Sequence, residues 1–305
     1  MASLPRPNPA ATDATGAPSS PRTLRHHRID DLDLAVHSWP GDGPPLLLLH
    51  GGMAHSSWWE RLAPELGAVC RPFALDRRGH GESEWVDASR YGWSRDIADI
   101  EAVLREVEPG PWILAGHSQG GLLAAEVATA GRVPLAGLVL VDIPLEPRSP
   151  ELMRTGRALR RMPQLHYRTL EDAVRRFQPY PPGHRIDAAE LARLAETSFR
   201  GTDDGRFTSR FHWQRFQAEE DAERHPLDGF SARLARIDVP TLVLRGEEST
   251  ILSPEDHAEM VRRIPGAVGV EIAESTHNLH VECAPEVGLA IRRFVADLPT
   301  AEGRS

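Results

Sequence analysis

Short apolar runs alternate along this chain with longer amphipathic stretches. Six runs have the length and apolar character of strands: Leu46–Leu49, Pro72–Leu75, Trp112–Ala115, Leu138–Val141, Thr241–Leu244 and Val268–Ile272. An unbroken run such as Leu46–Leu49 is typical of a strand that is buried on both faces. Five other stretches have the apolar spacing of helices: Trp58–Leu66, Asp96–Val107, Leu122–Ala130, His257–Ile264 and Pro285–Leu298. The alternation predicts a mostly parallel sheet covered by helices on both faces.

One section breaks this alternation. Between residues 144 and 238 there is no convincing buried strand, and three stretches have helical spacing: Glu151–Met162, Leu170–Phe177 and Ala188–Ser198. We therefore expect a helical cap, residues 144–238, inserted into a sheet domain made of residues 25–143 and 239–298. Residues 1–24 are rich in Pro, Ala, Ser and Thr and lack the apolar region of a signal peptide, which predicts a disordered tail. Residues 299–305 are expected to form a flexible tail.

The composition narrows the chemistry. All 35 basic residues are arginine, which excludes a lysine base, a Schiff base and a P-loop lysine. The net charge of −9 argues against nucleic acid as a partner. No segment approaches the roughly 20 apolar residues that cross a bilayer, so no membrane association is expected. Cys70 and Cys283 lie far apart without metal-ligand spacing, which disfavours a disulfide framework or zinc site and favours the cytoplasm.

The strongest chemical signal is the pentapeptide Gly116-His117-Ser118-Gln119-Gly120. It follows the predicted strand Trp112–Ala115 directly and precedes a predicted helix. A sharp strand-to-helix turn exposes a serine hydroxyl at the end of the sheet, and the flanking glycines let the two backbones come close. The helix start adds aligned N–H groups that favour developing negative charge. We therefore predict that Ser118 is a nucleophile; the alternative is a chance match in an ordinary loop.

The chain resembles the α/β-hydrolase family from about Arg25 to Leu298. The resemblance rests on the serine turn and three further motifs: His50-Gly51-Gly52, Asp76-Arg77-Arg78-Gly79-His80-Gly81 and Ser275-Thr276-His277-Asn278. It implies an α/β fold with a doubly wound, mostly parallel sheet of eight strands and a cap inserted after the sixth strand.

The same resemblance assigns roles to the first two motifs. It implies an oxyanion hole formed by the backbone N–H groups of Gly52 and Gln119, with Met53 as a further candidate donor. His50 is expected to order that loop. Asp76 and His80 are expected to be architectural and to transfer no proton.

The general base has to be chosen by position, because the chain contains 14 histidines. The resemblance implies a base in the loop between the last strand and the final helix, where His277 lies. His280, three residues later, is the alternative. His117 is adjacent to Ser118, but the geometry of the turn directs its ring away from the hydroxyl, toward the core or the pocket wall.

The acid is the point at which this chain departs from the family pattern. Similar chains carry an aspartate after the seventh strand, and Thr250 occupies that position here. A threonine cannot supply the negative charge that stabilises an imidazolium, and a neutral replacement in a serine protease lowers kcat about 10⁴-fold. Asp142, at the end of the sixth strand, and Glu248, two residues before Thr250, are the substitutes. The third alternative is that no carboxylate serves.

These residues together predict a serine hydrolase that forms an acyl-enzyme without cofactor or metal. Its substrate is expected to be a small molecule, in which the enzyme cleaves a carboxylic ester or a related lactone, thioester or carbon–carbon bond. Nine large apolar side chains of the cap are candidates for the pocket lining, although most of them are expected to form the cap's own core. They are Met153, Met162, Tyr167, Phe177, Tyr180, Phe199, Phe207, Phe211 and Trp213. The alternatives on the same fold are a biosynthetic cyclase or acyltransferase and, from a different class, a ligand-binding receptor.

Overall fold

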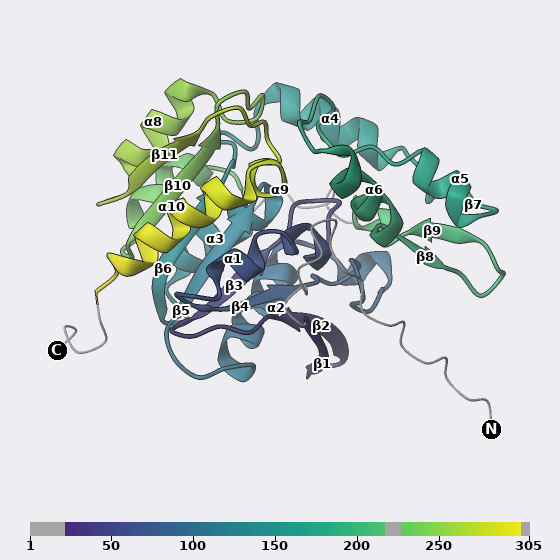
Figure 1. Ribbon diagram of the computed structural model, residues 1–305, viewed down its shortest axis with the longest axis horizontal. Coiled ribbons are helices and arrows are strands. Elements are labelled where there is room, and N and C mark those ends of the chain that lie inside the picture. Colours follow the sequence, from purple (N-terminus) through teal and green to yellow (C-terminus); the bar gives the residue numbers. More distant parts are fainter. Residues whose placement is uncertain (1–21, 217–226, 300–305) are drawn as a thin grey trace.

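A sheet of eight strands forms the centre of the computed structural model, which describes residues 22–216 and 227–299 (Figure 1). Its strands are β1 (Thr23–Ile29), β2 (Leu32–Ser38), β3 (Pro45–Leu49), β4 (Arg71–Leu75), β5 (Trp112–His117), β6 (Leu135–Val141), β10 (Thr241–Gly246) and β11 (Val268–Ile272). They lie in the order β1-β2-β4-β3-β5-β6-β10-β11. All pairs from β4 to β11 are parallel, and β2 is antiparallel to both of its neighbours. The expected α/β fold is confirmed.

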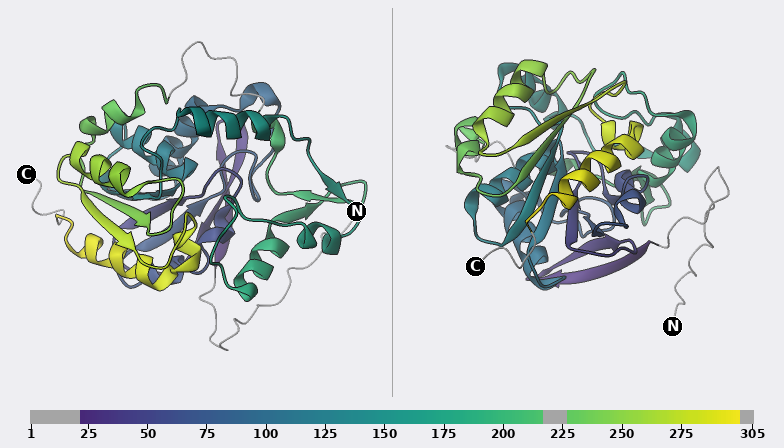
Figure 2. Two further views of the ribbon diagram at one scale, coloured as in Figure 1. Left: turned by 90° about the horizontal axis from the view of Figure 1, so that it is seen from above. Right: turned by 60° about the vertical axis from the view of Figure 1, so that its left-hand side comes forward.

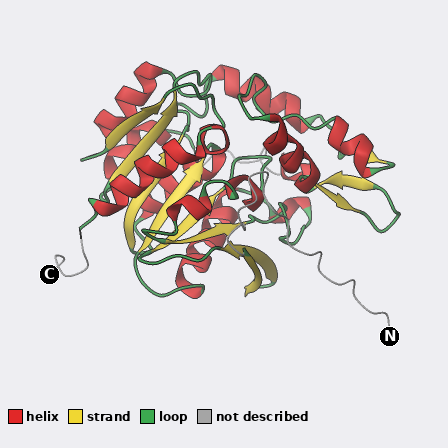
Figure 3. Cartoon of the chain, in the orientation of Figure 1, coloured by secondary structure: helices red, strands yellow, loops and turns green. Residues whose placement is uncertain are grey.

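Helices cover both faces of this sheet (Figure 3). One face carries α1 (Ala63–Leu66) and α10 (Ala284–Ala296), and the other carries α2 (Trp93–Glu106), α3 (Gln119–Ala130) and α8 (Pro254–Arg263). Alternate residues of the central strands separate into these two cores. Leu46 and Leu48 pack beneath α1 and α10, whereas Leu47 and Leu49 pack with the opposite helices. Burial on both faces explains why the run is wholly apolar.

The expected helix Trp58–Leu66 is wrong in extent. The segment forms a short 3₁₀ turn, η1 (Ser56–Trp59), followed by the single turn α1. Pro64 lies in the first turn of α1, where its missing N–H costs nothing, and it cannot continue a helix from the preceding residues. The other four predicted helices lie within α2, α3, α8 and α10 or overlap them by most of their length.

Described residues 144–216 of the expected cap lie together on one side of the sheet domain, and we call this part the cap (Figure 2). The expected boundary at residue 238 is wrong, because Leu227, Phe230, Leu234 and Ile237 pack in the sheet core with residues of α3 and α8. The cap contains the expected helices as α4 (Pro150–Arg160), α5 (Leu170–Arg175) and α6 (Ala188–Thr197), followed by η3 (Trp213–Phe216). The elements beside α3 and α8 are α7 (Phe230–Arg233) and η4 (Leu234–Arg236). The prediction of a purely helical cap is wrong, because β7 (His166–Tyr167), β9 (Phe207–Ser209) and β8 (Phe199–Gly201) form an antiparallel sheet. Strands of two or three residues are too short to show an alternating pattern.

The N-terminal boundary also needs correction. Thr23 pairs with Ser38 at the start of β1, so the first strand begins inside the range 1–24 that was expected to be a tail. The rest of that range, 1–21, and residues 300–305 of the expected C-terminal tail lie outside the described residues. Within the described part of the chain, no helix has the length and apolar character needed to cross a bilayer.

Candidate active site

Ser118 lies at the junction between β5 and α3, in a backbone conformation that is rare for a residue with a side chain. Its φ is 51° and its ψ is −122°. The N–H of Ser118 donates to the carbonyl of Val141 at 3.0 Å, and the Ser118 carbonyl accepts from Gly121 and Leu122. The surrounding structure thus holds a strained residue at the end of the sheet, as at many functional turns.

Glycines make this turn sterically feasible. A Cβ added at Gly116 would lie 2.3 Å from the carbonyl oxygen of Gly120, and one added at Gly120 would lie 2.3 Å from that of Leu49. These are backbone atoms of packed elements, which cannot move aside independently. The sequence pattern at this turn therefore follows from the close approach of α3 to the ends of β5 and β3 (Leu49 is the last residue of β3).

His277 and Asp142 meet next to this turn. Asp142, directly after β6, is fully buried, and its Oδ1 lies 2.7 Å from Nδ1 of His277. The same carboxylate accepts hydrogen bonds from the Ser249 hydroxyl at 2.6 Å and from the Gly246 N–H at 3.0 Å. Because a carboxylate accepts, Nδ1 of His277 carries the proton of this bond and Nε2 keeps its lone pair in the neutral ring.

Glu248, the other carboxylate considered, is engaged elsewhere. Its side chain is exposed and pairs with Arg185, whose Nε donates at 2.8 Å. The hydrogen bond from Arg185 lowers the pKa of Glu248 below its ordinary value. Thr250 is exposed as well. The hydroxyl of Ser249 accepts from the N–H groups of Ile251 and Leu252, so this loop turns in a way that directs Ser249 to Asp142.

The two other histidines near Ser118 occupy supporting positions. His117 donates from Nε2 to the carbonyl of His277 at 2.9 Å and thereby ties the His277 loop to β5. His280 packs behind it, with ring centroids 4.2 Å from His117 and 4.5 Å from Trp59. Burial lowers the pKa of His280 to about 3, and neither ring nitrogen bonds to any described residue. His280 does not line the cavity that contains Ser118.

The glycine loop after β3 lies against the serine turn. A Cβ added at Gly51 would be 3.5 Å from Cβ of Ser118, and one added at Gly52 would be 3.5 Å from Oε1 of Gln119. The backbone N–H groups of Gly52, Met53 and Gln119 donate to no acceptor among the described residues. Three backbone N–H groups without an acceptor among the described residues thus lie in the two segments that meet at the serine turn.

A set of buried side chains holds this loop by its carbonyl groups. His50 donates from Nδ1 to the carbonyl of Gly51 at 2.8 Å, and His80 donates from Nε2 to that of Gly52 at 2.8 Å. Burial lowers the pKa of both histidines well below the ordinary value, so both rings are neutral donors. Asp76 accepts from the N–H of Ser56 at 2.7 Å. These contacts fit the architectural roles expected for the three residues.

The sequence analysis missed a further member of this set, Arg77. Its Nη2 donates to the Gly51 carbonyl and to Oε1 of Gln119, both at 3.0 Å. Its other terminal nitrogen lies 3.8 Å from Asp96, and Asp96 also accepts from Arg215 of the cap at 3.2 Å. Arg77 thus connects both parts of the donor set to a carboxylate that the cap shares. The only signal for it in the sequence is its place in the motif that begins at Asp76.

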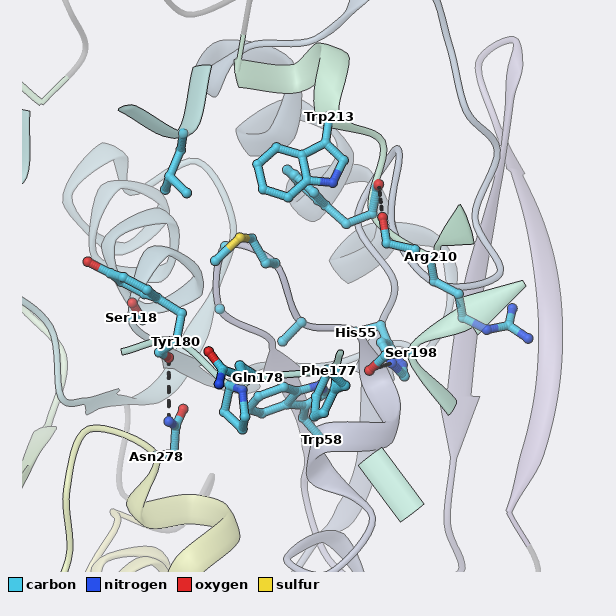
Figure 4. A pocket seen from close by; sticks show the side chains of 18 of the residues that line it. His55, Trp58, Ser118, Phe177, Gln178, Tyr180, Ser198, Arg210, Trp213 and Asn278 are labelled. Atoms are coloured by element: carbon cyan, nitrogen blue, oxygen red, sulfur yellow. Dashed lines mark hydrogen bonds between the residues drawn. The ribbon is translucent and has the colours of Figure 1, made fainter. Parts of the chain in front are cut away.

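Ser118, His277 and the glycine loop open into a cavity of about 480 Å³ beneath the cap (Figure 4). Seven of the nine large apolar cap side chains line it, more than expected: Met162, Tyr167, Phe177, Tyr180, Phe199, Phe211 and Trp213. Trp58 lines the cavity and Trp59 lies in the core, so the two adjacent tryptophans divide between these environments. Asn278 donates to the Tyr180 carbonyl at 3.4 Å and links the His277 loop to the cap (Figure 4).

Comparisons with known proteins agree with this architecture. Residues 46–289 match the model of the alpha/beta hydrolase family. The chain is 27% identical over 277 residues to the esterase Rv0045c of Mycobacterium tuberculosis, with 88% of each chain covered. It is 36% identical over 146 residues to protein phosphatase methylesterase 1 of Mus musculus, a match confined to 46% of this chain and 37% of that one.

Solved structures give the same result. An alpha/beta hydrolase from Novosphingobium aromaticivorans superposes with a TM-score of 0.73 at 28% identity, over 90% of this chain and 98% of the other. The thioesterase domain from the curacin biosynthetic pathway shares the fold, with a TM-score of 0.73 at 22% identity over 89% and 99% of the two chains. The chain belongs to the alpha/beta hydrolase family and is an esterase-like hydrolase.

Proposed function

We propose that this protein hydrolyses a carboxylic ester of a small to medium, largely apolar substrate through an acyl-enzyme on Ser118. The observation that carries the proposal is the 2.7 Å contact between Asp142 and Nδ1 of His277, made beside a cavity that His277 and Ser118 both line. A buried carboxylate on Nδ1 fixes the tautomer with a free lone pair on Nε2 and stabilises the imidazolium that forms when Nε2 takes a proton.

Acylation follows from this arrangement. The Ser118 oxygen attacks the ester carbonyl carbon while Nε2 of His277 accepts the hydroxyl proton. The carbonyl oxygen becomes an oxyanion and accepts hydrogen bonds from the N–H groups of Gly52 and Gln119, with Met53 as a third donor. When the intermediate collapses, the bond to the alcohol oxygen breaks, and the alcohol leaves with the proton from His277.

Deacylation repeats these steps with water. Nε2 of His277 accepts a proton from the attacking water, and the second intermediate expels the Ser118 oxygen, which recovers a proton from the imidazolium. The carboxylic acid product then leaves the cavity. A volume of about 480 Å³ with aromatic walls suits an acyl group and an alcohol of modest size.

Covalent labelling tests the nucleophile. A fluorophosphonate probe should modify Ser118, located by peptide mass spectrometry, and Ser118→Ala should neither label nor hydrolyse 4-nitrophenyl esters. A chain-length series of these esters then measures the acyl preference, and product analysis with added alcohol separates hydrolysis from acyl transfer. A correctly folded protein that is not labelled and hydrolyses no ester, but is stabilised by a ligand, would instead be a receptor.

A further inference from the structure

We propose that the substrate carries an anionic group, a carboxylate or a group of similar charge, that binds to Arg176 at the solvent-facing side of the cavity. The inference rests on the proposed function, because it concerns the substrate of the same site. It adds a chemical class to that substrate: an ester with an apolar body and one negative charge remote from the scissile bond.

The charge of the cavity lining carries the first step. The lining includes two arginines, Arg176 and Arg210, and among the described residues it includes no aspartate or glutamate. The whole chain, in contrast, carries a net charge of −9. Acidic residues are thus absent from the described lining of a cavity in a protein that is otherwise rich in them, which is the local arrangement that attracts an anion.

The two arginines differ in whether an acidic side chain pairs with them. Arg210 pairs with Glu82 at 2.6 Å, and in Figure 4 it lies far across the view from Ser118. Arg176 forms no ion pair within the described part of the chain, and its guanidinium carbon lies 5.9 Å from the ring centroid of Tyr167. An aromatic ring orients a cation without removing its charge. Arg176 therefore keeps its full capacity to bind a carboxylate.

Arg175, which precedes Arg176 in the chain, does have acidic partners. Arg175, the last residue of α5, pairs with Asp172 at 2.7 Å and approaches Glu171 at 3.9 Å. It does not line the cavity. Of these two adjacent arginines, Arg175 lies outside the cavity and pairs with acids, whereas Arg176 lines the cavity and pairs with no acid in the described ranges.

An aromatic wall leads from the core to this cation. Neighbouring rings along it have their centroids 5.6–6.4 Å apart, in the order Trp58, Phe177, Phe199 and Tyr167. All four line the cavity, and Arg176 lies against the last of them. A ligand that follows this wall places apolar atoms on the rings and a polar end at the guanidinium. Arginine binds a carboxylate with two parallel hydrogen bonds, which gives this end geometric selectivity.

Matched esters that differ only in charge test the inference. The first pair is the mono-4-nitrophenyl esters of adipic and suberic acid against the same esters with the free carboxylate converted to a primary amide. The second pair places the charge in the leaving group: 4-carboxyphenyl butanoate against 4-carbamoylphenyl butanoate. We expect the charged member of one pair to have a kcat/KM about tenfold higher, the size of effect for one partly exposed charge-assisted contact. The preference should decrease as salt is added.

Variants at the two adjacent arginines separate a specific contact from a general field. Arg176→Gln should bring the ratio of kcat/KM for the charged and neutral esters to about one, whereas Arg176→Lys should retain part of the preference. The control is Arg175→Gln, which removes the same charge one residue away, outside the cavity, and should keep the preference. Equal loss in Arg175→Gln and Arg176→Gln, or no preference in either pair, overturns the inference.

Binding to the inactive variant makes the result independent of turnover. In Ser118→Ala, calorimetric titration with the charged and neutral esters should give a dissociation constant about tenfold lower for the charged one, and adding Arg176→Gln should equalise the two. Equal dissociation constants in Ser118→Ala overturn the inference even if the wild-type protein hydrolyses both esters. If the preference in binding is present but no ester is hydrolysed, the proposed function fails and the anion site stands.

Discussion

Oδ1 of Asp142 lies 2.7 Å from Nδ1 of His277, although 135 positions separate the two residues in the chain. Asp142 directly follows β6, and His277 follows β11, two strands further along the sheet. The strand between them, β10, contributes the Gly246 N–H to the same carboxylate, and Ser249 contributes its hydroxyl from the loop that follows. The groups that hold the Asp142 carboxylate therefore come from β10 and the loop after it. This strand, β10, is the seventh strand, after which similar chains carry their aspartate.

Asp142→Asn should lower kcat by about 10⁴-fold, because an amide neither stabilises the imidazolium nor fixes the same tautomer. Steady-state kinetics with 4-nitrophenyl butanoate measures the effect, and a thermal unfolding curve checks that the fold is kept. The matched control is Glu248→Gln, which loses only an exposed ion pair with Arg185 and should stay within about threefold of wild type. If Glu248→Gln is the slow variant and Asp142→Asn is not, the acid has been assigned wrongly.

Arg77→Lys should reduce kcat by about 10- to 100-fold with little change in KM. The lysine keeps the charge but cannot donate two hydrogen bonds from one planar group to the Gly51 carbonyl and the Gln119 side chain. The N–H groups of Gly52 and Gln119 then lose an alignment that stabilises only the transition state, so kcat falls and KM does not. The comparison variant is Arg78→Lys, at the next residue of the loop. It breaks the buried ion pair between Arg78 and Asp99 and removes no hydrogen bond to Gly51 or Gln119. It should lower the melting temperature but leave kcat within about threefold. Equal kcat losses in the two variants would argue for a general packing effect.

Gly120→Ala should destabilise the protein by about 3 kcal/mol or more or prevent folding, because its Cβ would lie 2.3 Å from the Leu49 carbonyl oxygen and 2.5 Å from that of His50. Urea unfolding and soluble yield report the effect. Gly201→Ala, in β8 of the cap, meets no atom within 4 Å and should change the free energy of unfolding by less than about 0.5 kcal/mol. A fully stable Gly120→Ala protein would show that α3 does not approach β3 as closely as described.

Stability should fall as the pH is lowered from 6.5 toward 4. Burial lowers the pKa of His55 and His280 to about 3, below the ordinary value of 6.5. The unfolded chain therefore binds protons in this window that the folded protein does not, and each such histidine removes about 1.4 kcal/mol of unfolding free energy per pH unit. Above pH 7 these rings are neutral in both states and their contribution is constant.

His280→Leu isolates one of these contributions. At pH 8 the substitution changes only packing against Trp59 and His117. Below pH 6 the variant should lose stability more slowly than wild type, by about 1.4 kcal/mol per pH unit, because one proton-binding site has gone from the unfolded chain. Urea titrations at pH 8, 6 and 4.5 measure the two slopes. Parallel curves for the two proteins would mean that His280 takes up a proton in the folded state as well.

Much of the fold follows from patterns of short range. The apolar run at Leu46–Leu49 identifies a two-sided strand because both of its faces are buried, and the helix at Leu122–Ala130 shows its apolar residues within one element. The serine turn is also recognisable from five consecutive residues, since the crowding at Gly116 comes from Gly120 within the pentapeptide. The crowding at Gly120, in contrast, comes from Leu49 of β3. The strands β7, β8 and β9 are too short for apolar and polar residues to form a recognisable pattern. In β1 most residues are exposed, so its apolar positions do not mark it as a strand.

The sequence by itself determined the α/β alternation, the place of Ser118 on its turn and the loop that carries His277. The tertiary structure alone decided which carboxylate meets His277, that Arg77 donates to the glycine loop, and that Arg176 lines the cavity and pairs with no acidic residue among those described. The reason is physical. Local geometry and burial leave a trace in neighbouring residue types, whereas a contact between residues 135 positions apart depends on strand order and register, which no short segment encodes.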